Sequence, residues 1–223
     1  MKLTVITPVG PGHQDCVQKA IESVRDATNN TFSRITHAVI DDTQGIYGRS
    51  RARNSAMDDS DWYFFLDADD AMERDAPDLL KRNYSATFGS IKLGMRECRR
   101  KIRVSENNIL PCGWKEIDKH GASGTLCMGF FVKAEVAKSL RFDESLDFGE
   151  DFDFYMRLPD FIKIAEPLVT IGYNVPSATG PRGYENIDWL KVCRERIDYY
   201  LDHYAVLETS GRTETDPGKL RTI

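Results

Sequence analysis

The sequence predicts an α/β fold in which a mostly parallel central sheet is flanked by helices and carries a small antiparallel section. Short apolar runs alternate with amphipathic helical segments along the first third of the chain. Acidic residues follow two of these runs directly, at the strand ends where ligands bind in such sheets. The chain has 223 residues, 41% of them hydrophobic, which is enough for one full core.

The first predicted unit is a strand, a loop and a helix. Residues 3–7 form the apolar run, and the loop at residues 8–12 cannot be helical because it contains two prolines and two glycines. Asp15 is the predicted N-cap of the helix, with Gln18 three residues later. The apolar face of this helix is formed by Val17, Ala20, Ile21 and Val24.

The same pattern follows twice more. Residues 35–40 predict a second strand that ends in Asp41 and Asp42, and residues 49–57 predict a helix after a glycine-containing turn. Residues 62–66 predict a third, fully buried strand. Three strands that alternate with helices favour parallel pairing, with helices on both faces of the sheet.

The later elements are less regular. In order, the sequence predicts a helix at 77–83, half-exposed and antiparallel strands at 90–96 and 101–105, a helix at 114–120, a strand at 124–132, a helix at 133–140, a helix that begins at 149–154, and a strand at 162–171. We expect one domain over residues 1–183, an amphipathic helix at 184–207 packed on it, and a flexible polar tail at 208–223.

Bulk composition excludes several classes of function. The net charge of -5 argues against general binding to nucleic acid. The five cysteines are an odd number without a C-x-x-C pair, which favours reduced thiols and a cytoplasmic location. The sequence has no apolar run of 18 residues, so we expect no integral membrane segment.

The strand at 62–66 runs directly into Asp67, Asp69 and Asp70. Neighbouring carboxylates repel one another and resist burial, so a folded domain keeps them at the end of a core strand mainly when a cation compensates their charge. A divalent metal with a phosphate-bearing ligand is the natural occupant. An isolated Asp-x-Asp pair also arises by chance at solvated turns, and its position after a buried strand favours the metal site.

Two further groups of charged residues have both a structural and a functional interpretation. Glu150 and Asp151 fit the first turn of a helix, where the helix dipole favours acids, and they also fit a proton acceptor at the ligand edge of the sheet. Arg49, Arg51 and Arg53 form either a solvated basic face or a set of forks that match phosphate oxygens.

Taken together, these segments resemble the GT-A glycosyltransferases, and within them the family 2 type. The matching segments are Val5-Ile6-Thr7-Pro8, Asp41-Asp42, Ala52-Arg53-Asn54, Phe65-Leu66-Asp67-Ala68-Asp69-Asp70 and Gly149-Glu150-Asp151. The resemblance covers about residues 1–173. It implies the GT-A fold and an inverting, metal-dependent hexosyltransferase that moves a sugar from a nucleoside-diphosphate sugar, most simply a UDP-sugar, to a hydroxyl of a carbohydrate or other acceptor.

The resemblance also assigns nucleotide contacts. It implies that Thr7, Pro8 and one of Asp41 or Asp42 line the base and ribose pocket. Arg53 would approach the nucleotide.

The remaining implied roles concern the sugar, the metal and the chemistry. Asp67 would contact the ribose or the sugar, and Asp69 would bind Mg²⁺ or Mn²⁺ against the diphosphate. Asp151 would be the general base, with Glu150 supporting it or the acceptor.

The chain departs from the family pattern in two places. Only ten residues separate Asp42 from Arg53, fewer than is usual there, and a third metal ligand is missing. Some relatives supply a histidine after the Glu-Asp motif, whereas here the only later one is His203, on the amphipathic helix. Residues 174–183 are interpreted either as a lid over the diphosphate or as an ordinary connection.

Other nucleotide-binding classes fit less well. The sequence has no P-loop motif, residues 10–12 lack the third glycine of a dinucleotide-binding loop, and residues 8–15 lack the lysine of a sugar-nucleotide pyrophosphorylase. The alternative from another class is a non-catalytic module that binds a sugar nucleotide without turning it over.

Overall fold

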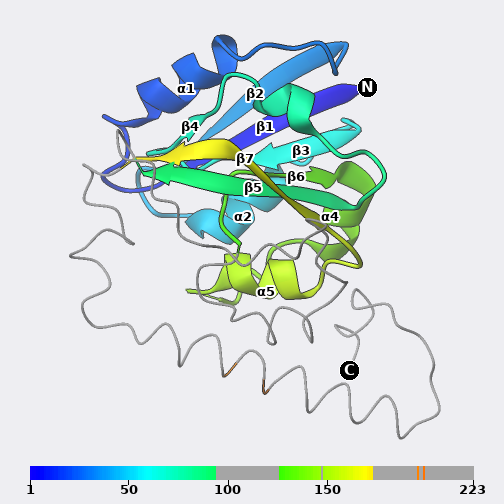
Figure 1. Cartoon of the computed structure of the whole chain (residues 1–223). Helices are drawn as coiled ribbons and strands as arrows, with labels where there is room; N and C mark the ends of the chain where they lie inside the picture. Colours follow the sequence, from blue (N-terminus) through cyan, green and yellow to red (C-terminus); the bar gives the residue numbers. More distant parts are fainter. Residues whose placement is uncertain (94–125, 147, 173–194, 196–197, 199–223) are drawn as a thin grey trace, which may run out of the picture.

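The computed structural model describes residues 1–93, 126–146, 148–172, 195 and 198 (Figure 1). Its sheet has seven strands in the order β2-β1-β3-β6-β5-β7-β4. The strands are β1 (Lys2–Val9), β2 (Arg34–Asp41), β3 (Trp62–Phe65), β4 (Ala71–Met72), β5 (Ala86–Leu93), β6 (Phe130–Lys133) and β7 (Ile162–Ile171). The helices are α1 (Val17–Arg25), α2 (Gly48–Ser55), the 3-10 turn η1 (Ala76–Leu79), α4 (Ala134–Leu140) and α5 (Glu150–Met156).

Most strands of this sheet run in one direction. Strand β1 pairs in parallel with β2 and β3, and β5 pairs in parallel with β7. Strand β6 is antiparallel to both β3 and β5, and β4 is antiparallel to β7. Only β6 and β4 are therefore reversed among the described strands, and the predicted mostly parallel α/β fold with a small antiparallel section is confirmed.

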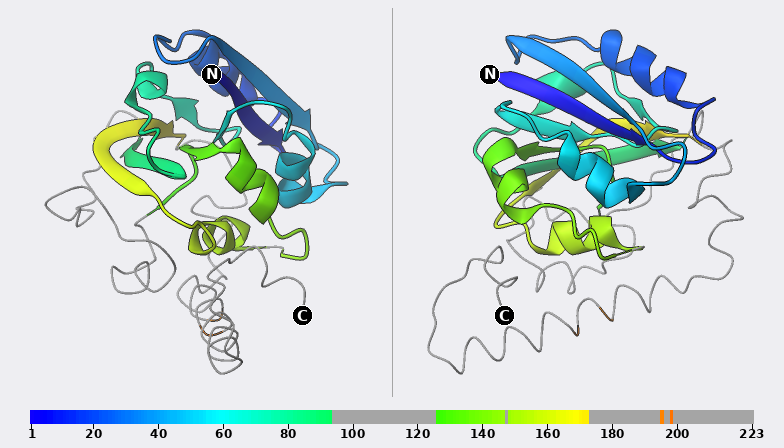
Figure 2. Two further views of the ribbon diagram at one scale, coloured as in Figure 1. Left: turned by 90° about the vertical axis from the view of Figure 1, so that its right-hand side faces the viewer. Right: turned by 180° about the vertical axis from the view of Figure 1, so that it is seen from behind.

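Helices cover both faces of the sheet, as the alternation of side chains along β3 requires (Figure 2). Tyr63 and Phe65 belong to a core that includes residues of α4 and α5. Trp62 and Phe64 belong to a second core with residues of α1 and η1. The first core is rich in aromatic contacts, among them a stacked pair of Phe142 with Phe154 at 4.4 Å between ring centroids.

The sheet curls toward itself. Strands β3 and β4 are third and seventh in the order, which in a flat sheet would separate them by about 19 Å. The six peptide steps from Phe65 to Ala71 reach about 20 Å only when fully extended. This segment is not extended but contains a turn, in which the Asp70 amide donates to the Asp67 carbonyl at 3.1 Å. Its reach is therefore well short of that distance. The far edge of the sheet must therefore approach β3, and α1 contacts both β1 and β4.

The first unit differs from its prediction at both ends of the loop. Strand β1 continues through Pro8 to Val9. The Val9 carbonyl faces β2 and accepts the amide hydrogen of Asp42, just after that strand, so the nitrogen of Pro8 faces β3. Proline is tolerated there because the pairing of β1 with β3 has ended at Ile6, and no hydrogen bond from Pro8 is needed. The predicted Asp15 cap is wrong: the residue before the helix is Cys16, and no side chain caps α1.

Three later predictions were also wrong in extent. The helix expected at 77–83 is the short 3-10 turn η1, which ends because Leu80 has an extended backbone, with φ -55° and ψ 131°. The strand expected at 124–132 is described only from Phe130, since Gly129 has a φ of 89° and precedes it in a bend. Strand β5 begins at Ala86, before the expected residue 90.

Several expected segments lie outside the described residues. They are the strand at 101–105, the helix at 114–120, the loop at 174–183 and the tail at 208–223, together with almost all of the helix at 184–207. In the described part of the chain, Cys16 and Cys127 are free thiols, and no helix is long and apolar enough to cross a membrane.

Candidate active site

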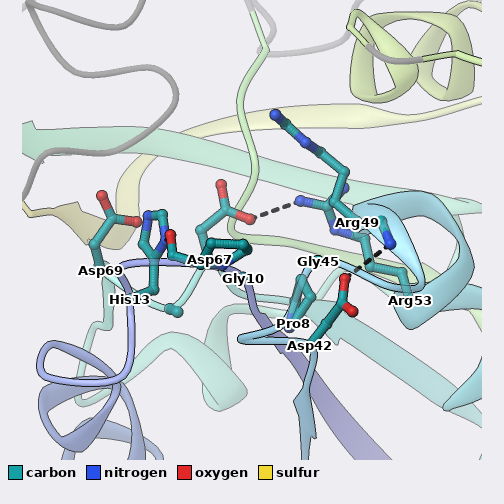
Figure 3. Close-up of a pocket in the computed structure, with 12 residues that line it drawn as sticks. Pro8, Gly10, His13, Asp42, Gly45, Arg49, Arg53, Asp67 and Asp69 are labelled. Atoms are coloured by element: carbon teal, nitrogen blue, oxygen red, sulfur yellow. Dashed lines mark hydrogen bonds and ion pairs between the residues drawn. The ribbon is translucent and has the colours of Figure 1, made fainter.

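A pocket of about 340 Å³ opens at the carboxyl ends of β1, β2 and β3 (Figure 3). This is the edge where the sequence predicts the ligand to bind. The lining residues come from the loops after these strands and from α2. They are Pro8, Gly10, Pro11, His13, Asp42, Gly45, Gly48, Arg49, Arg53, Asp67, Ala68 and Asp69.

The acid turn, residues 66–70, connects β3 to β4 and is fixed at both sides. The Asp67 carboxylate pairs with Arg53 at 2.8 Å, and the buried Asp70 carboxylate accepts the Gly172 amide hydrogen at 3.0 Å. Gly172 lies so close that a Cβ there would stand 1.8 Å from the Asp69 carbonyl oxygen. The end of β7 therefore braces this turn, and only glycine fits at that contact.

Negative charge is concentrated in the acid turn. Burial, followed by the charge of Asp67, raises the pKa of Asp69, while the nearby His13 lowers it. Burial and the charges of Asp67 and Asp69 raise the pKa of Asp70 well above its usual value. Burial and mutual repulsion thus disfavour the charged forms of Asp69 and Asp70, a cost that a bound cation would relieve.

Arg53 joins the two acidic groups that are far apart in the sequence. One of its terminal nitrogens donates to Asp67 at 2.8 Å and the other to Glu150 at 2.9 Å, and the side chain is 3% exposed. Arg49 approaches the same Glu150 oxygen at 3.6 Å. Burial lowers the pKa of Arg53, but the two carboxylates more than offset this effect and raise it. The Asp67–Arg53–Glu150 bridge places the start of α5 beside the pocket.

Arg157 and Gly149 hold α5 in this place. Arg157 pairs with Asp153 at 2.7 Å and donates to the carbonyls of Leu140 and Arg141 at the end of α4. Gly149 precedes α5 with a φ of 77°, in the left-handed region that glycine adopts readily.

Asn54 fastens α2 to the segment that leads to α5. Its side-chain amide donates to the Phe142 carbonyl at 2.9 Å and accepts the Phe142 amide hydrogen at 2.8 Å. Arg53 and Asn54 are adjacent, so one turn of α2 positions both the acid turn and the chain before α5.

Asp151 is half-buried beside this bridge. Burial, followed by the charge of Glu150, raises its pKa to about 6, while Arg53 lowers it and Asp67 raises it further. Its carboxylate accepts the backbone amide hydrogen of Phe152 at 2.7 Å. A carboxylate with this pKa is ionised near neutral pH and is basic enough to take a proton from a hydroxyl.

Five of the nine residues to which the resemblance assigns a role line the pocket. These are Pro8, Asp42, Arg53, Asp67 and Asp69. Glu150 and Asp151 adjoin the pocket through Arg53 and Asp67 rather than lining it.

The other two lie behind or outside it. Thr7 is fully buried, and its hydroxyl is hydrogen-bonded to Nε2 of His37 at 2.9 Å. Asp41 is exposed and accepts the Thr43 amide hydrogen, whereas both oxygens of Asp42 accept amide hydrogens, from Tyr47 and Gly48, each at 2.8 Å. Asp42 thereby shapes the loop that leads into α2.

His13 is a pocket residue that sequence reasoning missed. It lies in the loop between β1 and α1, directly after Pro11 and Gly12. The chain has only four histidines, so one in the loop after the first predicted strand, at the ligand edge of the sheet, was a signal that could have identified it.

The pocket fits a divalent cation shared with a phosphate ligand. Within residues 1–93, 126–146 and 148–172 no group of three or more His, Cys, Asp or Glu side chains could enclose a metal by itself. Asp69 and its neighbours supply oxygen ligands on one side only. Mg²⁺ and similar ions are commonly held in this way, by one or two carboxylates together with phosphates and waters.

No protein-family model matches the chain, and a search of curated proteins gave no match. Solved structures are similar to it. S. aureus TarS 1-349 in complex with UDP-GlcNAc superposes with a TM-score of 0.63 at 14% identity, over 93% of this chain and 67% of that one. S. aureus TarS superposes with a TM-score of 0.59 at 13% identity, over 77% of this chain.

These similarities show the fold, which is that of GT-A-like glycosyltransferases. The chain spans 36% of TarS and between 60% and 67% of TarS 1-349 in three structures. The TarS 1-349 structures hold UDP or UDP-GlcNAc.

Proposed function

We propose that this protein is a metal-dependent, inverting glycosyltransferase of the family 2 type that moves a hexose from a UDP-sugar to an acceptor hydroxyl. The observation that carries the proposal is the Asp67–Arg53–Glu150 bridge, in which Arg53 and Glu150 are buried. It brings the acid turn and the Glu150-Asp151 pair, distant in the sequence, to one pocket edge. The UDP-GlcNAc held by a TarS 1-349 structure of the same fold supports the choice of donor.

The pocket residues then divide into two groups. Pro8 and Asp42 face the base and ribose, and Asp42 retains lone pairs for a ligand because a carboxylate has about four acceptor sites. Thr7 supports this wall from behind through His37, and Asp41 lies at its exposed rim. Arg49 and Arg53 supply positive charge along the diphosphate side.

Asp69, with Asp67 beside it, is the residue that would hold Mg²⁺ or Mn²⁺. The bound cation would neutralise charge that develops on the departing nucleoside diphosphate. Asp67 is fixed by Arg53 and would orient the ribose or the sugar, while Asp69 is bonded by neither Arg53 nor Gly172.

Asp151 is the proposed general base. The acceptor oxygen forms a bond to the anomeric carbon as the bond from that carbon to the phosphate oxygen breaks, and the acceptor proton passes to Asp151. Glu150 pairs with Arg53 and Arg49, and from the position next to Asp151 it would support the base or the acceptor. Attack opposite to the leaving group inverts the anomeric configuration.

The test combines binding with turnover. Calorimetric titration of UDP-GlcNAc and UDP-glucose in the presence of MnCl₂ measures donor binding, and release of UDP measures turnover. We expect manganese-dependent binding and slow donor hydrolysis, and the Asp151→Asn variant should bind the donor normally while turnover falls by about 10²–10⁴-fold. NMR of the released sugar reports the first anomer formed.

Binding without hydrolysis or transfer to any acceptor would favour the non-catalytic module. Absence of any manganese-dependent nucleotide binding would overturn the proposal altogether.

A further inference from the structure

We propose that His13 is a second protein ligand for the divalent cation of Asp69 and that its imidazole makes this site prefer Mn²⁺ to Mg²⁺. The inference rests on the proposed function, because it concerns the same cation. His13 and Asp69 line one pocket from different loops, and their side chains lie beside one another at its end (Figure 3).

The backbone at His13 is rigidly held. Its amide donates to the Gly10 carbonyl at 3.1 Å, which closes a turn directly after β1. Its carbonyl accepts hydrogens from the backbone amides of Cys16 and Val17, each at 3.2 Å, and from the Cys16 thiol at 3.0 Å. His13 therefore links the end of β1 to the start of α1, and its ring is presented from an ordered position.

The hydrogen bond of the His13 ring leaves Nε2 as the nitrogen available to a metal. Nδ1 of His13 lies 3.1 Å from the Pro11 carbonyl oxygen, which can only accept a hydrogen bond. Nδ1 therefore carries the hydrogen, and in the neutral ring the lone pair lies on Nε2. Metal-binding histidines usually donate their other ring hydrogen in this way, commonly to a backbone carbonyl.

The neighbouring carboxylates leave Asp69 as the partner of His13. Arg53 occupies Asp67, and the Gly172 amide bonds to Asp70 on the far side of the turn. No hydrogen bond or ion pair joins His13 directly to Asp69 among the described contacts, so a cation between them displaces none. Both ions bind carboxylates, but Mn²⁺, a first-row transition metal, accepts an imidazole nitrogen more readily than Mg²⁺, which prefers oxygen ligands throughout.

The test uses MnCl₂ and UDP with the full chain. Pulsed EPR of the Mn²⁺–UDP complex detects the coupling of a directly bound imidazole nitrogen. We expect this coupling in the wild type and its loss in His13→Gln, with affinity for Mn²⁺ in the presence of UDP lowered by about 10–100-fold. Affinity for Mg²⁺ should change by less than about threefold.

His203→Gln is the matched control, because that histidine is the other one considered for this metal. The nitrogen coupling should persist in it. Two results would overturn the role of His13 and leave the transferase proposal intact. In one, the wild type binds Mn²⁺ and UDP without nitrogen coupling; in the other, the coupling persists in His13→Gln. The wild-type spectrum needs no variant, so a poorly folding His13→Gln protein still leaves a decisive result. Failure of the wild type to bind Mn²⁺ with UDP would instead defeat the proposed function.

Discussion

At the scale of single residues, Arg53 controls the charge of the site. Its guanidinium is buried between Asp67 and Glu150, and the guanidinium carbon lies over the ring of Phe142, 5.2 Å from the ring centroid. Buried charges are stable only when they are paired, so Arg53 and Glu150, which are both buried, depend on each other.

Replacement of Arg53 by Met should therefore lower the free energy of unfolding by about 3–5 kcal/mol, because Glu150 loses its buried partner. The double variant Arg53→Met/Glu150→Gln should recover part of this loss. Urea denaturation at neutral pH measures both. Arg51→Met is the matched control, since Arg51 is exposed on the same helix, and its effect should stay within about 0.5 kcal/mol. An equal loss in all three proteins would contradict the bridge as the cause.

The pKa of Asp151 predicts opposite effects on activity and stability. The proposed base acts as a carboxylate, so kcat/KM for transfer should fall below about pH 6, with a slope of one in a logarithmic plot. The folded state binds this proton more tightly than the unfolded chain, whose Asp has a pKa of about 3.9. The contribution of Asp151 to stability is therefore fully present below about pH 4 and is lost as the pH rises through about 6.

It follows that Asp151→Asn should raise the melting temperature at about pH 8, where the wild type keeps a charge in a desolvated place. The gain should shrink toward about pH 4, where the wild-type carboxyl is protonated in both states. Melting curves at several pH values show this. A gain that is independent of pH would mean that the Asp151 pKa is not raised.

At the scale of elements, the contact between the end of β7 and the acid turn determines where the carboxylates lie. Gly172→Ala places a methyl group against the Asp69 carbonyl, so the turn or the strand must move. We expect a loss of about 1–3 kcal/mol in unfolding free energy, together with weaker manganese-dependent binding of UDP. Chemical denaturation and calorimetry measure the two effects.

Gly10→Ala serves as the control for stability. A Cβ at Gly10 meets nothing within 4 Å, so that variant should unfold like the wild type. A Gly172→Ala protein of unchanged stability and affinity would show that the contact is unimportant.

The sequence predicted the elements whose patterns are local. The buried run of β3 and the apolar runs of β2 and β7 were found within a residue or two, because strand periodicity and flanking turns define them. The extent of η1 and the start of β6 were not predicted correctly, because packing against distant residues decides where these elements begin and end. Gly129, for instance, lies against Val169 of β7.

The same division applies to the site. Asp67 and Asp69 follow a strand and were recognisable, whereas the role of Asn54 depends on Phe142, 88 residues away. The roles of His13 and Arg157 likewise depend on neighbours that the fold supplies. Pairings of this kind have no local pattern, so the sequence alone could name the acids but not what holds them.

At the scale of the whole molecule, the described sheet already brings together every residue proposed to bind the nucleotide. Deletion of residues 184–223 should therefore leave UDP affinity within about threefold of the full chain, although transfer to an acceptor is expected to fall. Calorimetry with UDP and MnCl₂ tests this, with circular dichroism to show that the shortened protein is folded. Loss of UDP binding in a folded deletion variant would contradict the predicted domain boundary.

The hydrogen bond from Gly172 to Asp70 has a consequence for biogenesis. It spans 102 residues, and the bond from Arg53 to Glu150 spans 97. Contacts between such remote positions form slowly, because a long loop must close before they contribute any stability. During translation the acid turn leaves the ribosome long before its brace does. The nascent amino-terminal half accordingly emerges without the contact that braces its aspartates, and that contact can form only after β7 and Gly172 have been synthesised.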